Sequence, residues 1–210
     1  MISAGNDIVA LNLVDKERTN LPAFYSKFIT PDELSLHKDL TISFGNFVWL
    51  LWSVKESAYK YLKRGDEHLV FSPSKLIVQK LFVSTLTEHD HLQADQPVDV
   101  YYEGIVLTNS TDTLKFKSAL NNQFIATVIS EGDVYWGVKT IAEGDYHAQS
   151  DAVRLFALAK LDSIIIADEL WIDKHPSGYP FIVNGTHPLQ SPISFAHHGC
   201  YVSYAFQLSK

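Results

Sequence analysis

The stretch NFVWLLWSVKESAYKYLKR, from Asn46 to Arg64, carries the strongest helical pattern in the sequence. Its apolar residues recur at spacings of three and four, which places them on one face of a helix, and Gly65 follows as a stop signal. The apolar stripe consists of Phe47, Leu51, Val54, Ala58 and Leu62. The pattern predicts an amphipathic helix over residues 46–64.

Polar residues on this helix form a patch of their own. Glu56 and Lys60 lie one turn apart and project the same way, with Lys55 beside them in the sequence. Far upstream, Asp7 stands at the start of the apolar run Ile8-Val9-Ala10-Leu11, which predicts a buried strand. A buried carboxylate must be hydrogen-bonded, paired or metal-bound. Two structural interpretations are alternatives to a functional site. In the first, Asp7 only forms a turn or a cap; in the second, Glu56 and Lys60 only form an ion pair within the helix.

Two carboxylates together with a phosphate oxygen are a typical ligand set for Mg²⁺, which takes part of its shell from water and substrate. Lysines beside such a site would neutralise phosphate charge. Asp7 and Glu56 are therefore candidate metal ligands, with Lys60 as the neighbouring cation.

The rest of the chain predicts an α+β fold, with mostly antiparallel sheet packed on two long helices. Between residues 69 and 148, β-branched and aromatic runs are typical of strands, and residues 124–138 predict a hairpin. A second long helix is predicted to begin at Ser150 as its N-cap. Residues 124–138 and 194–206 share a similar pattern and are a possible repeat.

Composition excludes several classes of partner. A formal net charge of −7, without a long run of Lys or Arg, argues against a general affinity for nucleic acid or anionic membranes. The longest apolar stretch, Phe47 to Trp52, is far shorter than the roughly 20 residues that span a bilayer. The start of the chain has no signal-peptide pattern, and the single Cys200 fits a reducing compartment. These features predict a cytoplasmic protein.

Residues 52–60, WSVKESAYK, resemble the signature W-x-x-K-E-[AS]-x-x-K of the 4′-phosphopantetheinyl transferases at every defined position. Gly5-Asn6-Asp7-Ile8 is similar to the G-x-D-[IV] motif that precedes this signature in the family. The helix motif is specific, and other blocks support it. These supporting blocks are residues 24–33, 71–75, 178–181 and 193–205.

The resemblance implies an enzyme of the holo-[acyl-carrier-protein] synthase type. Such enzymes transfer the 4′-phosphopantetheine arm of coenzyme A (CoA) to a serine of an apo acyl or peptidyl carrier protein, with Mg²⁺, in fatty-acid, polyketide or related synthesis. It implies that Asp7 and Glu56 are the Mg²⁺ ligands and that Asp7, Glu56 and Lys60 form the catalytic set. The alternative is a non-catalytic homologue that binds CoA or the carrier protein.

The same resemblance implies further contacts to CoA from Lys55, His197, Ser194 and Arg154. His197 would bind the 3′-phosphate or an adjacent phosphate, and Lys55 would brace the same site. The chain departs from the family pattern at Tyr179, which replaces the lysine of G-K-P, and at Ala196, which replaces the second serine of S-x-S-H.

The order in which the family-like sequence blocks occur along the chain predicts the domain organisation. In two-lobed members of the family, the block that matches residues 193–205 comes before G-x-D, whereas here it comes last. We therefore expect a pseudo-dimer of two similar lobes in permuted order, 1–148 and 149–210, and a monomer rather than a homo-oligomer. This arrangement predicts that the strand at residues 202–206 lies beside the strand of Asp7, with Met1 near Lys210.

Overall fold

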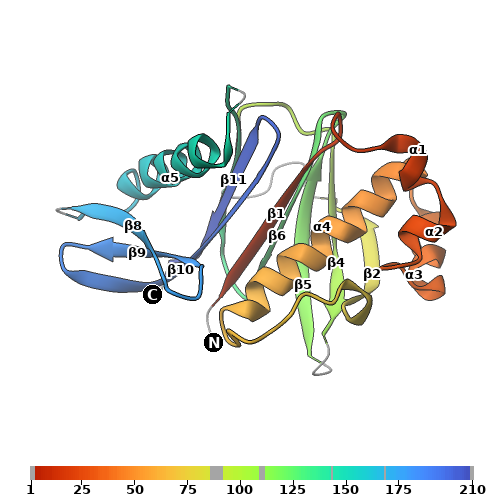
Figure 1. Cartoon of the computed structure of the whole chain (residues 1–210), viewed down its shortest axis with the longest axis horizontal. Coiled ribbons are helices and arrows are strands. Elements are labelled where there is room, and N and C mark those ends of the chain that lie inside the picture. Colours follow the sequence, from red (N-terminus) through yellow and green to blue (C-terminus); the bar gives the residue numbers. More distant parts are fainter. Residues whose placement is uncertain (1–2, 86–91, 109–111, 143, 168, 209–210) are drawn as a thin grey trace.

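The computed structural model describes residues 3–85, 92–108, 112–142, 144–167 and 169–208. Two β-sheets lie side by side, and each is covered by one long helix (Figure 1). The predicted α+β class and the largely antiparallel pairing agree with this arrangement.

The first sheet is antiparallel throughout and has the strand order β1-β6-β5-β4-β2. Its long helix is α4, Phe44–Lys63, which packs on β1 and β6. The strands are β1 (Ala4–Ala10), β2 (Ile77–Val83), β4 (Val100–Leu107), β5 (Thr113–Leu120) and β6 (Phe124–Ser130).

The second sheet has the order β3-β7-β11-β10-β9-β8 and is antiparallel except for the β3–β7 pair. Its long helix is α5, Tyr146–Asp162. The strands are β3 (Leu92–Ala94), β7 (Tyr135–Thr140), β8 (Leu170–Lys174), β9 (Pro180–Asn184), β10 (His187–His198) and β11 (Tyr201–Phe206).

Short helices connect these elements around α4. Thr30 caps α3 through a capping box, in which its hydroxyl accepts from the Glu33 backbone N–H and the Glu33 carboxylate accepts from the Thr30 N–H. The short helices are α1 (Lys16–Thr19), α2 (Pro22–Tyr25), α3 (Pro31–Ser35), η1 (Leu36–Asp39) and η2 (Pro73–Lys75).

Apart from β3, which comes from the middle of the first half, both sheets follow the same chain order. In each, a first strand leads into the long helix, and that strand later pairs with the last strand of its half: β1 with β6, and β7 with β11. The chain joins the second sheet briefly at β3, between β2 and β4 of the first sheet, and passes from the first sheet to the second again at residues 131–134. The lobes 1–148 and 149–210 stay a prediction, and β7 belongs to the second sheet although it precedes residue 149.

The predicted hairpin at residues 124–138 is wrong. β6 pairs with β1 and β5, whereas β7 pairs with β11 and β3, so these consecutive strands lie in different sheets. Two apolar runs with a turn between them indicate two strands, but strand partners depend on contacts distant in sequence. Residues 194–206 do form a hairpin, so the two stretches compared as a repeat differ in their pairing.

Both long helices are present, with shifted starts. α4 begins after Ser43, whose hydroxyl accepts from the Asn46 N–H at 3.3 Å, and its buried face contains the predicted stripe except for the half-buried Leu62. α5 begins after Asp145, whose carboxylate accepts from the Ala148 N–H at 2.9 Å. The predicted start at Ser150 is wrong because the exposed first turn of α5 carries no apolar signal.

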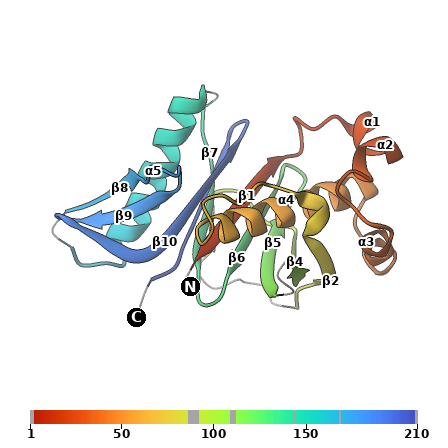
Figure 2. The same cartoon turned by 60° about the horizontal axis from the view of Figure 1, so that its bottom comes forward.

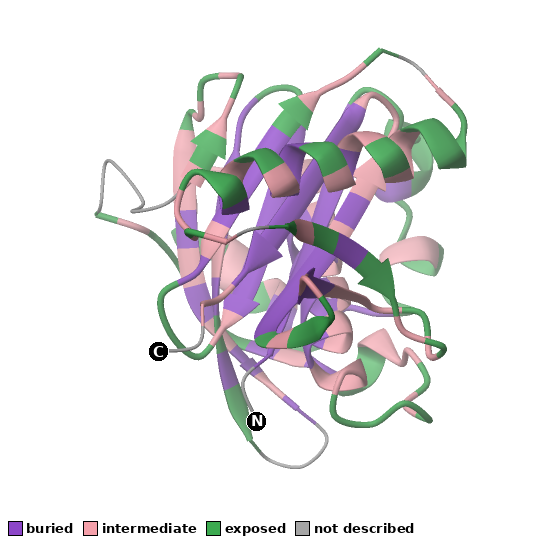
Figure 3. Cartoon of the chain, turned by 90° about the vertical axis from the view of Figure 1, so that its left-hand side faces the viewer, coloured by how far each residue is buried: buried purple, intermediate pink, exposed green. Residues whose placement is uncertain are grey.

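The core has three parts: one cluster lies between α4 and the first sheet, one lies between α5 and the second sheet, and a third joins strands of the two sheets without any residue of either long helix. The strands behind α5 are buried, while the outer side of this helix is exposed (Figure 3). None of the helices in the described part of the chain is both long and apolar enough to span a membrane.

The β10–β11 hairpin runs beside β1, where the two sheets meet (Figures 1 and 2). We call this line of contact the seam. The predicted proximity of residues 202–206 to the strand of Asp7 is confirmed by a 3.0 Å hydrogen bond from Asn6 Nδ2 to Ser203 Oγ. Met1 and Lys210, predicted to be neighbours, lie outside the described residues.

Candidate active site

Helix α4 touches strand β1 at Gly5. A Cβ at this position would overlap the carbonyl oxygen of Ser57, so only glycine permits the close approach. The small, buried Ser57 faces the sheet here and donates to the Thr127 carbonyl at 3.3 Å. This contact brings Asp7, two residues further along β1, against the polar residues of α4.

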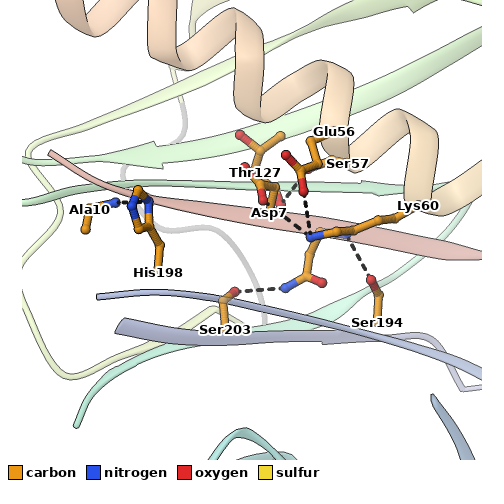
Figure 4. Close-up of polar contacts among 10 residues, drawn as sticks. Asp7, Ala10, Glu56, Ser57, Lys60, Thr127, Ser194, His198 and Ser203 are labelled. Atoms are coloured by element: carbon orange, nitrogen blue, oxygen red, sulfur yellow. Dashed lines mark hydrogen bonds and ion pairs between the residues drawn. The ribbon is translucent and has the colours of Figure 1, made fainter. Parts of the chain in front are cut away.

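Lys60 lies between the two predicted metal ligands (Figure 4). Its Nζ is 3.3 Å from Asp7 Oδ1 and 3.6 Å from Glu56 Oε1. The Asp7 side chain is only 8% exposed, whereas those of Glu56 and Lys60 are 30% and 25% exposed. The structure thus brings together the three predicted catalytic residues, one of them buried and two open to solvent.

Burial raises the pKa of the Asp7 carboxyl to about 7. The positive charge of Lys60 acts in the opposite direction, and the negative charge of Glu56 adds to the rise. Asp7 Oδ2 is buried and makes no hydrogen bond of standard geometry among the described residues, although the neighbouring Ser53 hydroxyl acts to lower the pKa of Asp7. A desolvated carboxylate with a free oxygen would be stabilised by a further cation.

Asp7 and Glu56 fit a Mg²⁺ site of the kind that the protein only partly encloses. The described residues contain no cluster of three or more Asp, Glu, His or Cys side chains that would hold a metal alone. Mg²⁺ commonly binds one or two carboxylates and takes its other ligands from water and substrate phosphates. The free Oδ2 of Asp7 is the observation that supports this fit.

Metal-free protein is expected to be destabilised by Asp7 as the pH rises. Because the folded-state pKa lies above the usual 3.8, protonated Asp7 contributes stability below about pH 4, and this contribution is lost as the pH rises through about 7. Asp7→Asn should therefore gain stability relative to the wild type between pH 5 and 8, by an amount of the order of a few kcal/mol.

Thermal unfolding of both proteins in EDTA, from pH 5 to pH 8, measures this difference. Saturating Mg²⁺ should reduce it, because a ligand that binds only the folded wild type raises its stability. A melting-temperature difference that does not change with pH would contradict the assignment of the raised pKa to Asp7.

Side chains of β10 hold the second sheet against β1. The Asn6 N–H donates to Ser194 Oγ at 3.2 Å, and the Ala10 N–H donates to His198 Nδ1 at 3.2 Å (Figure 4). These two bonds bracket Asp7 along the strand. Ser194, predicted as a CoA contact, is thus beside the carboxylate site, with its hydroxyl oxygen bonded to β1.

His198 is a site residue that the sequence prediction missed. Because Nδ1 accepts a hydrogen bond, the ring proton of the neutral imidazole is on Nε2. Burial lowers the pKa of His198, and the nearby Glu56 acts in the opposite direction. Its place beside β1 depends on the seam, which no local pattern predicts.

His197 lies on the same strand and packs edge-on against Tyr146, with ring centroids 5.2 Å apart. Burial lowers the pKa of His197, and the charges of Lys60 and His198 lower it further. His197 is therefore close enough to Lys60 to be affected by its charge, and its ring contact is with Tyr146. A neutral His197 would contact a phosphate through hydrogen bonding rather than through charge.

The structure does not bring Lys55 to this group. Lys55 is fully buried on another face of α4, where its Nζ lies 2.7 Å from Glu33 Oε1. It also donates to the carbonyl oxygens of Phe28 at 2.6 Å and Pro73 at 3.1 Å. Lys55 thus acts as a packing partner behind the site, and the predicted direct contact with CoA has no support from this geometry.

The contacts of Arg154 also lie away from the Asp7–Lys60–Glu56 group. Its Nη1 donates to Ser150 Oγ at 2.6 Å and lies 3.8 Å from Asp151 Oδ1, both on α5. These contacts hold the guanidinium along its own helix. The structure therefore gives Arg154 a local role and leaves its predicted contact with CoA as a hypothesis.

A cavity of about 270 Å³ opens beside Lys60, between the end of α4 and the strands β9 and β10. Its lining, among the described residues, includes three cations from the end of α4 and its C-cap, and no carboxylate. The cations are Lys60, Lys63 and Arg64. Lys63 Nζ donates to the carbonyls of Glu67 and Leu69, and Lys60 is paired with the two carboxylates. Cations next to a pair of carboxylates suit a substrate that carries several phosphates.

A family model for the 4′-phosphopantetheinyl transferase superfamily matches residues 3–106, about half of the chain. No curated protein and no solved structure matches the chain. The matched segment contains β1 and α4, and with them Asp7, Glu56 and Lys60. The chain belongs to the 4′-phosphopantetheinyl transferase superfamily, and phosphopantetheine transfer is the general activity that this membership supports.

Proposed function

We propose that this protein transfers the 4′-phosphopantetheine arm of CoA to a serine of an acyl or peptidyl carrier protein in a Mg²⁺-dependent reaction, as a cytoplasmic enzyme. The observation that carries the proposal is the Asp7–Lys60–Glu56 group beside a cavity lined by cations. Phosphoryl transfer depends mainly on positioning and charge stabilisation, and this group provides both.

Asp7 and Glu56 would hold the metal ion, and bound Mg²⁺ would neutralise negative charge on the pyrophosphate of CoA. In the reaction, the serine hydroxyl oxygen of the carrier bonds to the phosphorus that carries the pantetheine arm. The bond from this phosphorus to the bridging oxygen breaks, and its electron pair leaves with adenosine 3′,5′-bisphosphate.

Lys60 and Glu56 would act on this step directly. Lys60, as an ammonium group, would stabilise the charge that develops on the leaving phosphate. Glu56, the more exposed carboxylate, would accept the proton of the serine hydroxyl. Ser194 and His197, on the opposite side of the seam, would contact CoA phosphates.

The pseudo-dimer with lobes in permuted order belongs to the same proposal. Its support is the chain order that the two halves share apart from β3, in which a strand, a long helix and further strands follow one another. One chain would then supply both sides of the site, which favours a monomer.

Intact-mass spectrometry tests the proposed function. A panel of apo carrier proteins is incubated with this protein, CoA and Mg²⁺, with EDTA in a matched reaction. We expect a mass gain of one phosphopantetheine on at least one carrier, and we expect EDTA to abolish it. CoA binding without transfer to any carrier would instead favour the non-catalytic homologue.

A further inference from the structure

Arg64 joins the end of α4 to the second sheet. It is the C-cap residue of the helix, and its guanidinium reaches across to two backbone carbonyls of neighbouring strands. Nη1 donates to the Ile193 carbonyl on β10 at 2.8 Å, and Nη2 donates to the Pro180 carbonyl on β9 at 3.3 Å. One side chain of the first half thus fixes two strands of the second.

The same guanidinium covers one face of Tyr179. Arg64 Cζ lies 4.6 Å from the centre of the Tyr179 ring. The ring also stacks on His175, with centroids 4.5 Å apart and planes inclined by 5°. His175 is itself held by a 2.6 Å hydrogen bond between Nδ1 and Ser177 Oγ. Contacts with Arg64 and His175 therefore hold the half-buried ring of Tyr179 in place.

Arg64 and Tyr179 form a wall between two cavities. Both residues line the 270 Å³ cavity beside Lys60, and both line a second cavity of about 370 Å³ on the side of Phe181 and Leu189. The shape of the cavity beside the catalytic group consequently depends on this pair. We call the pair the Arg64–Tyr179 wall.

The position of Arg64 on the helix links this wall to the site. Glu56, Lys60 and Arg64 are spaced by four residues, so their side chains leave one face of α4. Glu56 and Lys60 contact one another, whereas Arg64 contacts the second half. The wall therefore borders the space where a substrate that touches Lys60 would lie.

We propose that Arg64 is a positioning residue for CoA: through the Arg64–Tyr179 wall it fixes the cavity that receives CoA, and it takes no part in the chemical step. This inference rests on the proposed function. It predicts that loss of Arg64 weakens CoA binding and leaves turnover at saturating CoA nearly unchanged. Tyr179 then contributes its ring to the cavity wall.

The test compares Arg64→Lys and Arg64→Met in the full chain. Lysine keeps the charge but cannot bond both carbonyls while stacking on the ring, because it lacks the planar fork of arginine. We expect both variants to raise KM and Kd for CoA at least tenfold, with kcat within about twofold of the wild type. Kd is measured by calorimetry, independently of transfer.

Variants of Tyr179 test the second residue of the Arg64–Tyr179 wall. Tyr179→Leu removes the stacked ring and should raise Kd as Arg64→Met does, whereas Tyr179→Phe keeps the ring and should bind like the wild type. The double variant Arg64→Met with Tyr179→Leu should be no worse than either single variant, because the two residues act as one unit.

Lys160→Met is the matched control. Lys160 lies 5.6 Å from the centre of the Tyr135 ring, a comparable cation–π contact on the second half, and we expect its loss to leave Kd for CoA unchanged. Wild-type affinity in Arg64→Lys would overturn the inference, as would a fall in kcat at unchanged KM. If the wild type neither binds CoA nor transfers from it, the proposed function fails as well, and the inference with it.

Discussion

Replacing Glu56 by glutamine is expected to lower kcat for phosphopantetheine transfer by roughly 10³-fold, the size of effect seen when a charge-stabilising or proton-accepting group is lost. Glutamine keeps the shape of the side chain but removes the negative charge that pairs with Lys60 and would bind Mg²⁺. Glu56 is 30% exposed, so the fold depends little on its charge. The loss should therefore appear in turnover and not in stability.

Steady-state transfer to a carrier protein, with melting temperatures measured in parallel, tests this expectation. Glu169→Gln, at an exposed position before β8, makes the same chemical change away from the site and should retain full activity. Near-normal turnover in Glu56→Gln would contradict the assigned role. Carrier binding that survives in Glu56→Gln would show that the variant is folded.

Replacing Lys55 by methionine is expected to lower the free energy of unfolding by about 3–5 kcal/mol, because it leaves a buried charge without its partner. The carboxylate of Glu33 is fully buried and lies 2.7 Å from Lys55 Nζ. The carbonyls of Phe28 and Pro73 would also lose their donor. A loss of this size lowers the melting temperature of a chain of this length by roughly 10 °C.

Glu33→Gln in the Lys55→Met background should recover part of this loss. Glutamine retains an oxygen that can accept from the Thr30 or Val78 N–H, as the Glu33 carboxylate does, and it removes the unpaired charge. Chemical denaturation of the wild type and the single and double variants measures the recovery. A melting temperature of Lys55→Met within 2 °C of the wild type, as an order-of-magnitude threshold for no effect, would contradict the structural role.

The local part of the candidate site could be predicted because helical geometry depends only on sequence spacing. Glu56 and Lys60 are four residues apart, so any helix over this stretch places them together. Asp7 was identifiable because a carboxylate in a buried strand requires a partner. The same spacing could also have placed Lys55 correctly, since it follows Leu51 of the apolar stripe by four residues.

The remaining contacts could not be predicted, because they depend on which strands become neighbours. His198 and Ser194 reach β1 only because β10 lies along the seam. Glu33 reaches Lys55 only because α3 packs behind α4, and the capping box around Thr30 gives no indication of that second partner. The separation of β6 and β7 into different sheets has the same nonlocal cause.

The short connection from β6 to β7 affects how the activity of the site depends on protein concentration. Residues 131–134 span at most about 14 Å when extended, so the two halves remain within reach of each other even if their contacts break. Each half therefore meets the other at a very high effective concentration, fixed by the covalent connection. Specific activity should then be constant over a wide range of protein concentrations.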